Sequence, residues 1–267
     1  GKGTLVRVMN ETESPEVYQH LKDKNGKWIE RDDAFIRHWN KQGVMAGGVS
    51  IGFTGYGSMH SRHHIGPELQ IGHRLGDHLK QPVLLIKTAW GGKSIYKDFR
   101  PPSAGGETGE YYQKMFSEVN EALASYESEF PSLKGMKPMW GGFFWFQGWN
   151  DMFDENSRAQ YEDNLVCLIK DVRKHLQQPL LPVVVGELGN MGEDAGANMQ
   201  MIRDAQRKAC QRKEWKGRVS FVKTTEFARL KEESPNVGHG HHWFGNAESY
   251  FLIGDALGKE MVRLLQR

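Results

Sequence analysis

Three short segments of this sequence combine the groups that stabilise anions and transfer protons, namely glycine N–H groups, side-chain amides, carboxylates and imidazoles. They span residues 90–94 (WGGKS), 147–151 (QGWND) and 238–243 (GHGHHW). Each is also rich in residues that form turns, so each has a structural as well as a functional interpretation. What chemistry they support therefore depends on the elements that position them.

The first segment contains two adjacent glycines, Gly91 and Gly92. Because glycine has no Cβ, its backbone N–H can approach a ligand closely. Such N–H groups can stabilise the oxyanion of a tetrahedral intermediate. The alternative is a tight turn between a strand and a helix that needs positive φ.

The second segment places an amide, a carboxylate and a large aromatic ring side by side, at Asn150, Asp151 and Trp149. The Asn150 amide can donate to developing negative charge, and the Asp151 carboxylate can orient a histidine. An Asn-Asp pair after a strand is also a common turn or helix cap, so a purely structural role for these two residues stays open.

The third segment holds three imidazoles, at His239, His241 and His242, just before the last predicted helix. A loop histidine is a natural general base, because its pKa lies close to neutral pH. The same cluster could bind a metal, although the chain has no paired cysteine ligands and no HExxH motif. A second patch, His60, His63 and His64, is expected to be a solvated loop.

Short apolar runs alternate with amphipathic segments along the chain, which predicts βαβ crossovers and a parallel sheet covered by helices. In such a sheet, ligands bind beyond the carboxyl ends of the strands. The first fifty residues are expected to be irregular, with a short hairpin. Residues 1–267 are predicted to form one domain. The predicted strands are 48–53, 83–89, 140–147, 182–188 and 218–224, and the predicted helices are 67–80, 109–129, 157–177, 197–213 and 246–265.

Composition excludes several classes of protein. The net charge of +2 is too small for a strong electrostatic field. The basic residues between 203 and 216 are expected to form a solvated helix face, so no nucleic-acid partner is predicted. No apolar run approaches the roughly 18 residues of a membrane span. Cys167 and Cys210 are expected to be buried free thiols. The chain begins at Gly1 without methionine, so we expect a removed leader and export, with a cytoplasmic location as the alternative.

Four segments together carry a resemblance to a known family. They are residues 66–69 (GPEL), 87–95 (KTAWGGKSI), 145–151 (WFQGWND) and 242–248 (HWFGNAE). In this order they resemble the sialate O-acetylesterase-like branch of the SGNH hydrolases, which is also similar to acetyl xylan esterases. The resemblance implies a flavodoxin-like three-layer α/β/α sandwich with a parallel central sheet. It also implies ester hydrolysis through an acyl-serine intermediate, without a cofactor or metal.

The resemblance also assigns roles to residues. Gly91 or Gly92 would donate a backbone N–H to the oxyanion, and Asn150 would be its side-chain donor. His242 would be the general base, with His239 or His241 as substitutes. Asp151 is the nearest candidate for the acid partner of the histidine.

Three positions depart from the family pattern. The Gly-Gln-Ser-Asn block with the nucleophilic serine is not found in the chain, and residues 1–3 (GKG) resemble the family's residues immediately after that block. We therefore expect a preceding strand and serine loop. The glutamate expected after Gln-Gly is Trp149, and the aspartate expected three residues before the histidine is His239. Neither position expected for the acid partner therefore holds a carboxylate in this sequence.

The expected function is the removal of acetyl groups from a carbohydrate. Trp149, Trp90, Gln147 and Glu68 are the predicted substrate contacts. Trp243 and Tyr56 would offer further flat surfaces on which sugar rings stack. One alternative is a catalytically silent carbohydrate-binding module on the same fold. The other is a metal-dependent hydrolase that uses the histidine cluster.

Overall fold

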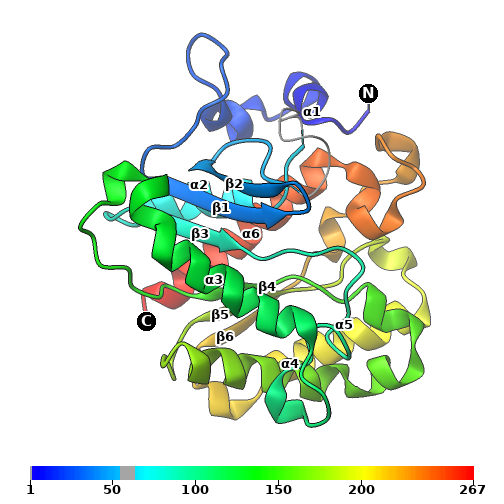
Figure 1. Ribbon diagram of the computed structural model, residues 1–267. Helices are drawn as coiled ribbons and strands as arrows, with labels where there is room; N and C mark the ends of the chain where they lie inside the picture. The colour runs from blue at the N-terminus through cyan, green and yellow to red at the C-terminus, as the bar shows by residue number, and fades with distance from the viewer. Residues whose placement is uncertain (1, 55–63) are drawn as a thin grey trace. The chain divides into compact units, whose positions relative to one another are not determined.

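The computed structural model describes residues 2–54 and 64–267 (Figure 1). The chain divides into two compact units. Unit 1 comprises Gly1–Ala89, Ala124–Gly135 and Phe227–Lys259, and unit 2 comprises Trp90–Leu123, Met136–Glu226 and Glu260–Arg267.

Strands and helices alternate over most of the chain. The strands are β1 (Ala34–Asn40), β2 (Gly43–Gly48), β3 (Val83–Lys87), β4 (Phe143–Trp145), β5 (Val183–Gly186) and β6 (Val219–Val222). The α-helices are α1 (Leu5–Glu11), α2 (Glu68–His78), α3 (Glu110–Glu129), α4 (Glu155–His175), α5 (Ala197–Cys210) and α6 (Ala247–Leu265).

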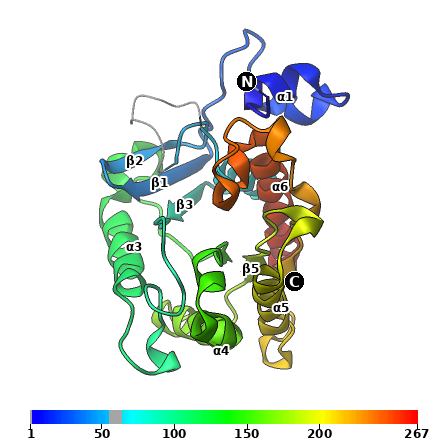
Figure 2. The same cartoon turned by 90° about the vertical axis from the view of Figure 1, so that its right-hand side faces the viewer.

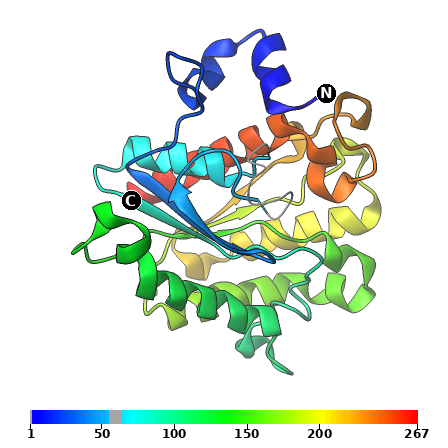
Figure 3. The same ribbon diagram turned by 45° about the horizontal axis from the view of Figure 1, so that its top comes forward.

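Unit 1 contains a three-stranded sheet with the order β2-β1-β3. Strands β1 and β2 form an antiparallel hairpin, seen in blue in Figure 3, in which Phe35 pairs with Gly48. Strands β1 and β3 are parallel, with Ala34 opposite Val83. Helix α2 packs against β1 and β3, and its buried Leu69 joins the apolar core of this unit.

Unit 2 contains a second three-stranded sheet, β4-β5-β6, in which every pair is parallel. The central strand β5 is a run of three valines and a glycine, all buried, as expected for a parallel strand covered on both faces. Helix α4 packs against α5 (Figure 2). Helix α5 also packs against β6. The core of this unit is built mainly from α4, β5 and α5.

The α/β class and the parallel pairing predicted from the sequence are confirmed, as are the strands predicted at 83–89, 140–147, 182–188 and 218–224. The strand predicted at 48–53 is wrong. Strand β2 ends at Gly48, the backbone of Val49 still hydrogen-bonds to Ala34 and Arg31, and residues 51 and 52 form a turn. The apolar side chains of Val49, Ile51 and Phe53 are buried. The predicted hairpin is present, although its strand β1 also pairs with β3.

Two further predictions need correction. Arg203 does not belong to a solvated face, because it is 5% exposed and donates to the carbonyl oxygens of Leu188, Asn190 and Gly192. Both cysteines are free, but only Cys210 is fully buried and Cys167 is half-buried. Within the described ranges, no helix combines the length and apolar character that a membrane crossing requires.

Candidate functional site

The diglycine turn of unit 2 brings a backbone N–H and a side-chain amide together. Gly91 and Gly92 are both exposed. Gly92 adopts a left-handed conformation with φ of +72°, which favours glycine. A Cβ atom at Gly92 would lie 3.9 Å from Nδ2 of Asn150, whereas one at Gly91 would have no neighbour within 4 Å. Gly92 and Asn150, separated by more than fifty residues of sequence, therefore converge.

Asn150 begins a 3₁₀ turn, η4 (Asn150–Phe153), that follows strand β4. The segment before this turn is fixed at the carbonyl oxygen of Gln147. That oxygen accepts hydrogen bonds from the Tyr161 hydroxyl at 2.7 Å and from Nε2 of Gln206 at 2.9 Å. Because Tyr161 and Gln206 are both 0% exposed, this anchor is rigid.

Asp151 ties the 3₁₀ turn η4 to the segment after the diglycine turn. Its Oδ2 accepts from the backbone N–H of Ile95 at 3.0 Å and from Nε2 of Gln147 at 2.6 Å. Its Oδ1 accepts from the N–H of Tyr96 at 3.1 Å. The Nε2 group of Gln147 also donates to the carbonyl of Lys93 at 2.9 Å. Asp151 and Gln147 thus hold the two segments in register.

Burial governs the charge of Asp151. The residue is 0% exposed, and this burial raises the pKa of its carboxyl group to about 6, against the opposing effect of the three hydrogen bonds. All three donors belong to unit 2. In this structure Asp151 positions the loop, and its predicted role as partner of the catalytic histidine stays a prediction.

Trp90 is held by a buried carboxylate that the sequence analysis missed. Its indole Nε1 donates to Oε1 of Glu118 at 2.9 Å, and the ammonium group of Lys114 lies 4.5 Å from the ring centroid. Glu118 is 2% exposed, and burial raises the pKa of its carboxyl group to about 7. The sequence could have indicated Glu118, because it lies between Met115 and Ala122 on the buried face of α3. A carboxylate on a buried face needs a hydrogen-bond or ionic partner.

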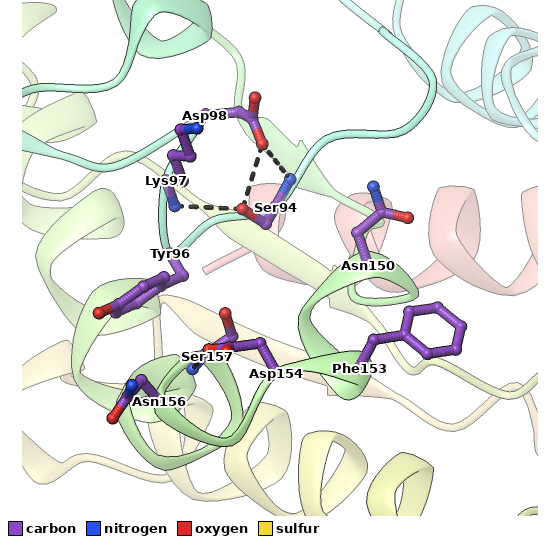
Figure 4. A pocket seen from close by; sticks show the side chains of 9 residues that line it. All are labelled: Ser94, Tyr96, Lys97, Asp98, Asn150, Phe153, Asp154, Asn156 and Ser157. Carbon is purple, nitrogen blue, oxygen red and sulfur yellow. Dashed lines mark hydrogen bonds between the residues drawn. The ribbon is translucent and has the colours of Figure 1, made fainter.

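An open pocket of about 510 Å³ lies next to Asn150 in unit 2 (Figure 4). Asn150 and Phe153 line it from η4, while Asn156 and Ser157 line it from the first turn of α4 (Figure 4). The rest of the lining is Ser94, Tyr96, Lys97, Asp98 and Asp154. Trp149 is partly buried against the core of unit 2, and its ring centroid is 6.1 Å from that of Phe153.

The histidine cluster lies in unit 1, where His241 and His242 belong to the 3₁₀ segment η9 (Gly240–Gly245) and His239 is its N-cap. The ring centroids of His241 and His242 are 4.3 Å apart, and those of His239 and His241 are 5.1 Å apart. Buried Trp243 and Phe244 anchor the segment, both at positive φ. Burial, aided by the two neighbouring imidazoles, lowers the pKa of His242 to about 4.

Within the described part of the chain, no group of three or more His, Cys, Asp or Glu side chains is arranged to hold a metal ion. Glu68, also in unit 1, forms an ion pair with Lys87 in which Oε1 and Nζ are 3.0 Å apart. Lys87 also donates to the carbonyl of Phe53 at 2.7 Å. Glu68 is therefore paired with Lys87 in this structure, and its predicted contact with the substrate stays a prediction. Tyr56, His60 and His63 lie outside the described residues, and His64 is exposed.

Comparison with known proteins decides the family. The profile described as "Carbohydrate esterase, sialic acid-specific acetylesterase" matches residues 3–263. The chain belongs to this carbohydrate esterase family. The carbohydrate esterase family and the α/β fold predicted from the sequence are thereby confirmed, whereas the roles of Asn150, Gly92 and His242 stay predictions.

Two solved structures share the fold of this carbohydrate esterase chain. A protein from Arabidopsis thaliana has a TM-score of 0.60 and 19% identity, with 91% of this chain and 90% of that chain covered. A carbohydrate acetylesterase from Xanthomonas citri has a TM-score of 0.53 and 13% identity, with 95% of this chain but 53% of that chain covered. No curated protein sequence matches the chain.

Proposed function

We propose that the protein is a serine ester hydrolase that removes acetyl groups from carbohydrates. The observation that carries the proposal is the convergence of Gly92 and the Asn150 amide in unit 2. In this proposal Gly92, in a left-handed conformation, and Asn150 supply two N–H donors from segments that Asp151 and Gln147 hold in register. Preorganised donors of this kind stabilise the oxyanion of acyl transfer.

In this proposal a serine hydroxyl attacks the acetyl carbonyl carbon, and His242 takes the hydroxyl proton. The carbonyl oxygen becomes an oxyanion that accepts hydrogen bonds from the Gly92 N–H and the Asn150 amide. When the intermediate collapses, the bond to the sugar oxygen breaks, and that oxygen takes the proton from His242. Water then attacks the acetyl-serine in the same way and releases acetate.

Family membership supports the reaction class, because the matched profile describes carbohydrate esterases. Because burial lowers its pKa to about 4, the His242 imidazole is neutral at neutral pH, which is the protonation state a general base needs, and it is a weaker base than an ordinary histidine. The nucleophile is not assigned within residues 1–267, which contain no Gly-Gln-Ser-Asn block.

The test uses the natural gene product. Acetate release from an acetylated saccharide and from p-nitrophenyl acetate is measured, and a fluorophosphonate probe followed by peptide mapping identifies the reactive serine. We expect hydrolysis of both esters, complete inhibition by the probe and one labelled serine. Hydrolysis that resists the probe but stops with a chelator would instead support a metal-dependent enzyme. Sugar binding without hydrolysis or labelling would support a silent binding module.

A further inference from the structure

A buried cluster of polar side chains lies behind the turn that carries Asn150. Its members are Tyr161 of α4 and Gln206 of α5, both 0% exposed. The two side chains come from different helices, yet both donate to one acceptor, the carbonyl oxygen of Gln147. Burying a hydroxyl and an amide costs free energy unless both are hydrogen-bonded. Because these hydrogen bonds are made to the main chain, they fix the backbone three residues before Asn150.

The Tyr161 hydroxyl is the centre of this cluster. It donates to the main-chain carbonyl of Gln147 at 2.7 Å, with the side-chain Oε1 of the same residue at 3.3 Å. It accepts from Nε1 of Trp145 and from Nε2 of Gln206, each at 3.3 Å. Burial raises the pKa of Tyr161, so the hydroxyl keeps the proton that it donates. Its one donor and both acceptor lone pairs are therefore used.

Gln206 joins the same carbonyl to the loop that follows β5. Its Oε1 accepts from the backbone N–H of Leu188 at 2.8 Å, while its Nε2 donates to the Gln147 carbonyl at 2.9 Å. One side-chain amide therefore spans the segments that follow two neighbouring parallel strands, β4 and β5. These segments lie at the carboxyl ends of the strands, where parallel sheets place their ligand-binding groups.

The backbone between the cluster and Asn150 has little room to move. A Cβ atom at Gly148 would lie 3.0 Å from Cγ2 of Ile202 and 3.3 Å from Nε2 of Gln206, so Gly148 packs directly on α5. The N–H of Asp151 donates to the carbonyl of Gly148 at 3.2 Å, which closes the turn that begins at Asn150 (Figure 4). A shift of the carbonyl that the cluster holds would therefore move the Asn150 amide.

We propose that Tyr161 and Gln206 are positioning residues for ester hydrolysis, which hold the Asn150 amide where the oxyanion forms. The inference rests on the proposed function, because it requires Asn150 to be an oxyanion donor. Both residues are fully buried, so they act through the backbone of residues 147–150 and not by touching the substrate. A donor stabilises the transition state only when it is held in place before the reaction. A displacement of about 1 Å can lower the rate about 10²-fold.

A double-mutant cycle with Asn150 tests the proposal. The kcat and KM for p-nitrophenyl acetate are measured for Tyr161→Phe, Asn150→Ala and the double variant of the natural gene product. The temperature is one at which thermal denaturation shows every variant to be folded. We expect Tyr161→Phe to lower kcat about tenfold with little change in KM, a smaller loss than removal of the donor itself. In the Asn150→Ala background it should change kcat less than about twofold, because the donor that it positions is then absent.

Gln206→Leu is the second variant, because it removes the amide donor and keeps the Tyr161 hydroxyl. It should behave like Tyr161→Phe, with a kcat loss of about tenfold that shrinks to less than about twofold in the Asn150→Ala background. Tyr112→Phe is the matched control. Tyr112 is also a buried tyrosine of unit 2, and its ring lies 5.1 Å from that of Phe116 on the same helix. This control should keep the wild-type kcat and KM.

A loss of kcat by the same factor in both backgrounds would overturn the proposal, because a purely structural hydroxyl or amide acts independently of Asn150. Wild-type kcat in both Tyr161→Phe and Gln206→Leu would overturn it as well. If Asn150→Ala still lowers kcat in either case, the proposed function stands without this inference. Wild-type kcat in Asn150→Ala would instead reject the oxyanion role of Asn150, and the positioning role with it.

Discussion

Gly92 has a left-handed backbone conformation and faces the amide of Asn150 across 3.9 Å, measured from the position of an added Cβ to Nδ2. An alanine at this position would be strained by its φ of +72°, and its methyl group would lie against the Asn150 amide, 3.9 Å from Nδ2. Gly105 provides a control with the same backbone strain, because its φ is +73° and an added Cβ would meet nothing within 4 Å.

We therefore predict that Gly92→Ala and Gly105→Ala each lower the free energy of unfolding by about 1 kcal/mol. Only Gly92→Ala should lower kcat for p-nitrophenyl acetate, by about tenfold or more. Urea denaturation and steady-state kinetics on both variants measure the two effects. Equal activity of the two variants would show that the left-handed turn at Gly92 has no part in the reaction.

Glu118 makes stability depend on pH. Its pKa is raised from 4.5 to about 7, chiefly by burial, so the folded state binds its proton more tightly than the unfolded state. The contribution of Glu118 is then fully present below about pH 4.5 and is lost as the pH rises through 7. Glu118→Gln keeps an acceptor for the Trp90 indole and carries no charge.

We expect Glu118→Gln to match the wild type in stability at low pH and to exceed it by about 1 to 3 kcal/mol at pH 8. Urea denaturation across this range tests the expectation, with Glu107→Gln, exposed in the loop before the same helix, as the control. A difference that is the same at every pH would contradict the account of Glu118.

The low pKa of His242 predicts the acid limb of the pH–rate profile. Because His242 accepts a proton in the proposed mechanism, activity should fall as the pH drops through about 4 and be constant above about 5. His242→Ala should lower kcat by about 10²- to 10⁴-fold. Exposed His78→Ala is the control and should keep the wild-type profile. An acid limb near pH 6.5, the value of an ordinary histidine, would contradict this assignment.

At the scale of elements, Arg203 of α5 holds the loop that follows β5. It donates to the carbonyl oxygens of Leu188 at 2.7 Å and of Asn190 at 2.8 Å, and burial lowers its pKa. A lysine at position 203 has no planar guanidinium group and cannot donate to all of these carbonyl oxygens at once. We therefore expect Arg203→Lys to lower the free energy of unfolding by about 2 to 4 kcal/mol. Arg207→Lys, half-exposed on the same helix, should change it by less than about 0.5 kcal/mol. Similar losses in the two variants would contradict the role of Arg203.

The elements also show why sequence patterns failed where they did. Strand β1 was predicted only as part of a short hairpin in an otherwise irregular region, because it contains Arg37 and His38, yet both are buried. Arg37 pairs with Glu129 at 2.9 Å, and His38 hydrogen-bonds the carbonyl of Lys87 at 3.2 Å. A hydrophobicity pattern treats charged residues as exposed to solvent. It therefore fails to predict a strand whose charged side chains are buried and paired with residues far away in the sequence.

At the scale of the whole molecule, the order of strands, helices and motifs was predictable, because buried parallel strands and amphipathic helices leave strong patterns. The convergence of Gly92 with Asn150 was also predictable, since both come after apolar runs that read as strands. The division into two units was not, because it depends on long-range packing. The pocket lined by Phe153 was missed for a related reason, since nothing in the sequence marks that ring as exposed.

The measurement that tests the central claim most directly is the kinetics of Asn150→Ala against Asn198→Ala. Asn198 is an exposed residue in the first turn of α5, also in unit 2, so its variant controls for the loss of an amide. We predict that Asn150→Ala lowers kcat for p-nitrophenyl acetate about 10²- to 10³-fold with little change in KM, the signature of a lost oxyanion donor. Asn198→Ala should retain wild-type kinetics. Wild-type kcat in the Asn150→Ala variant would contradict the account.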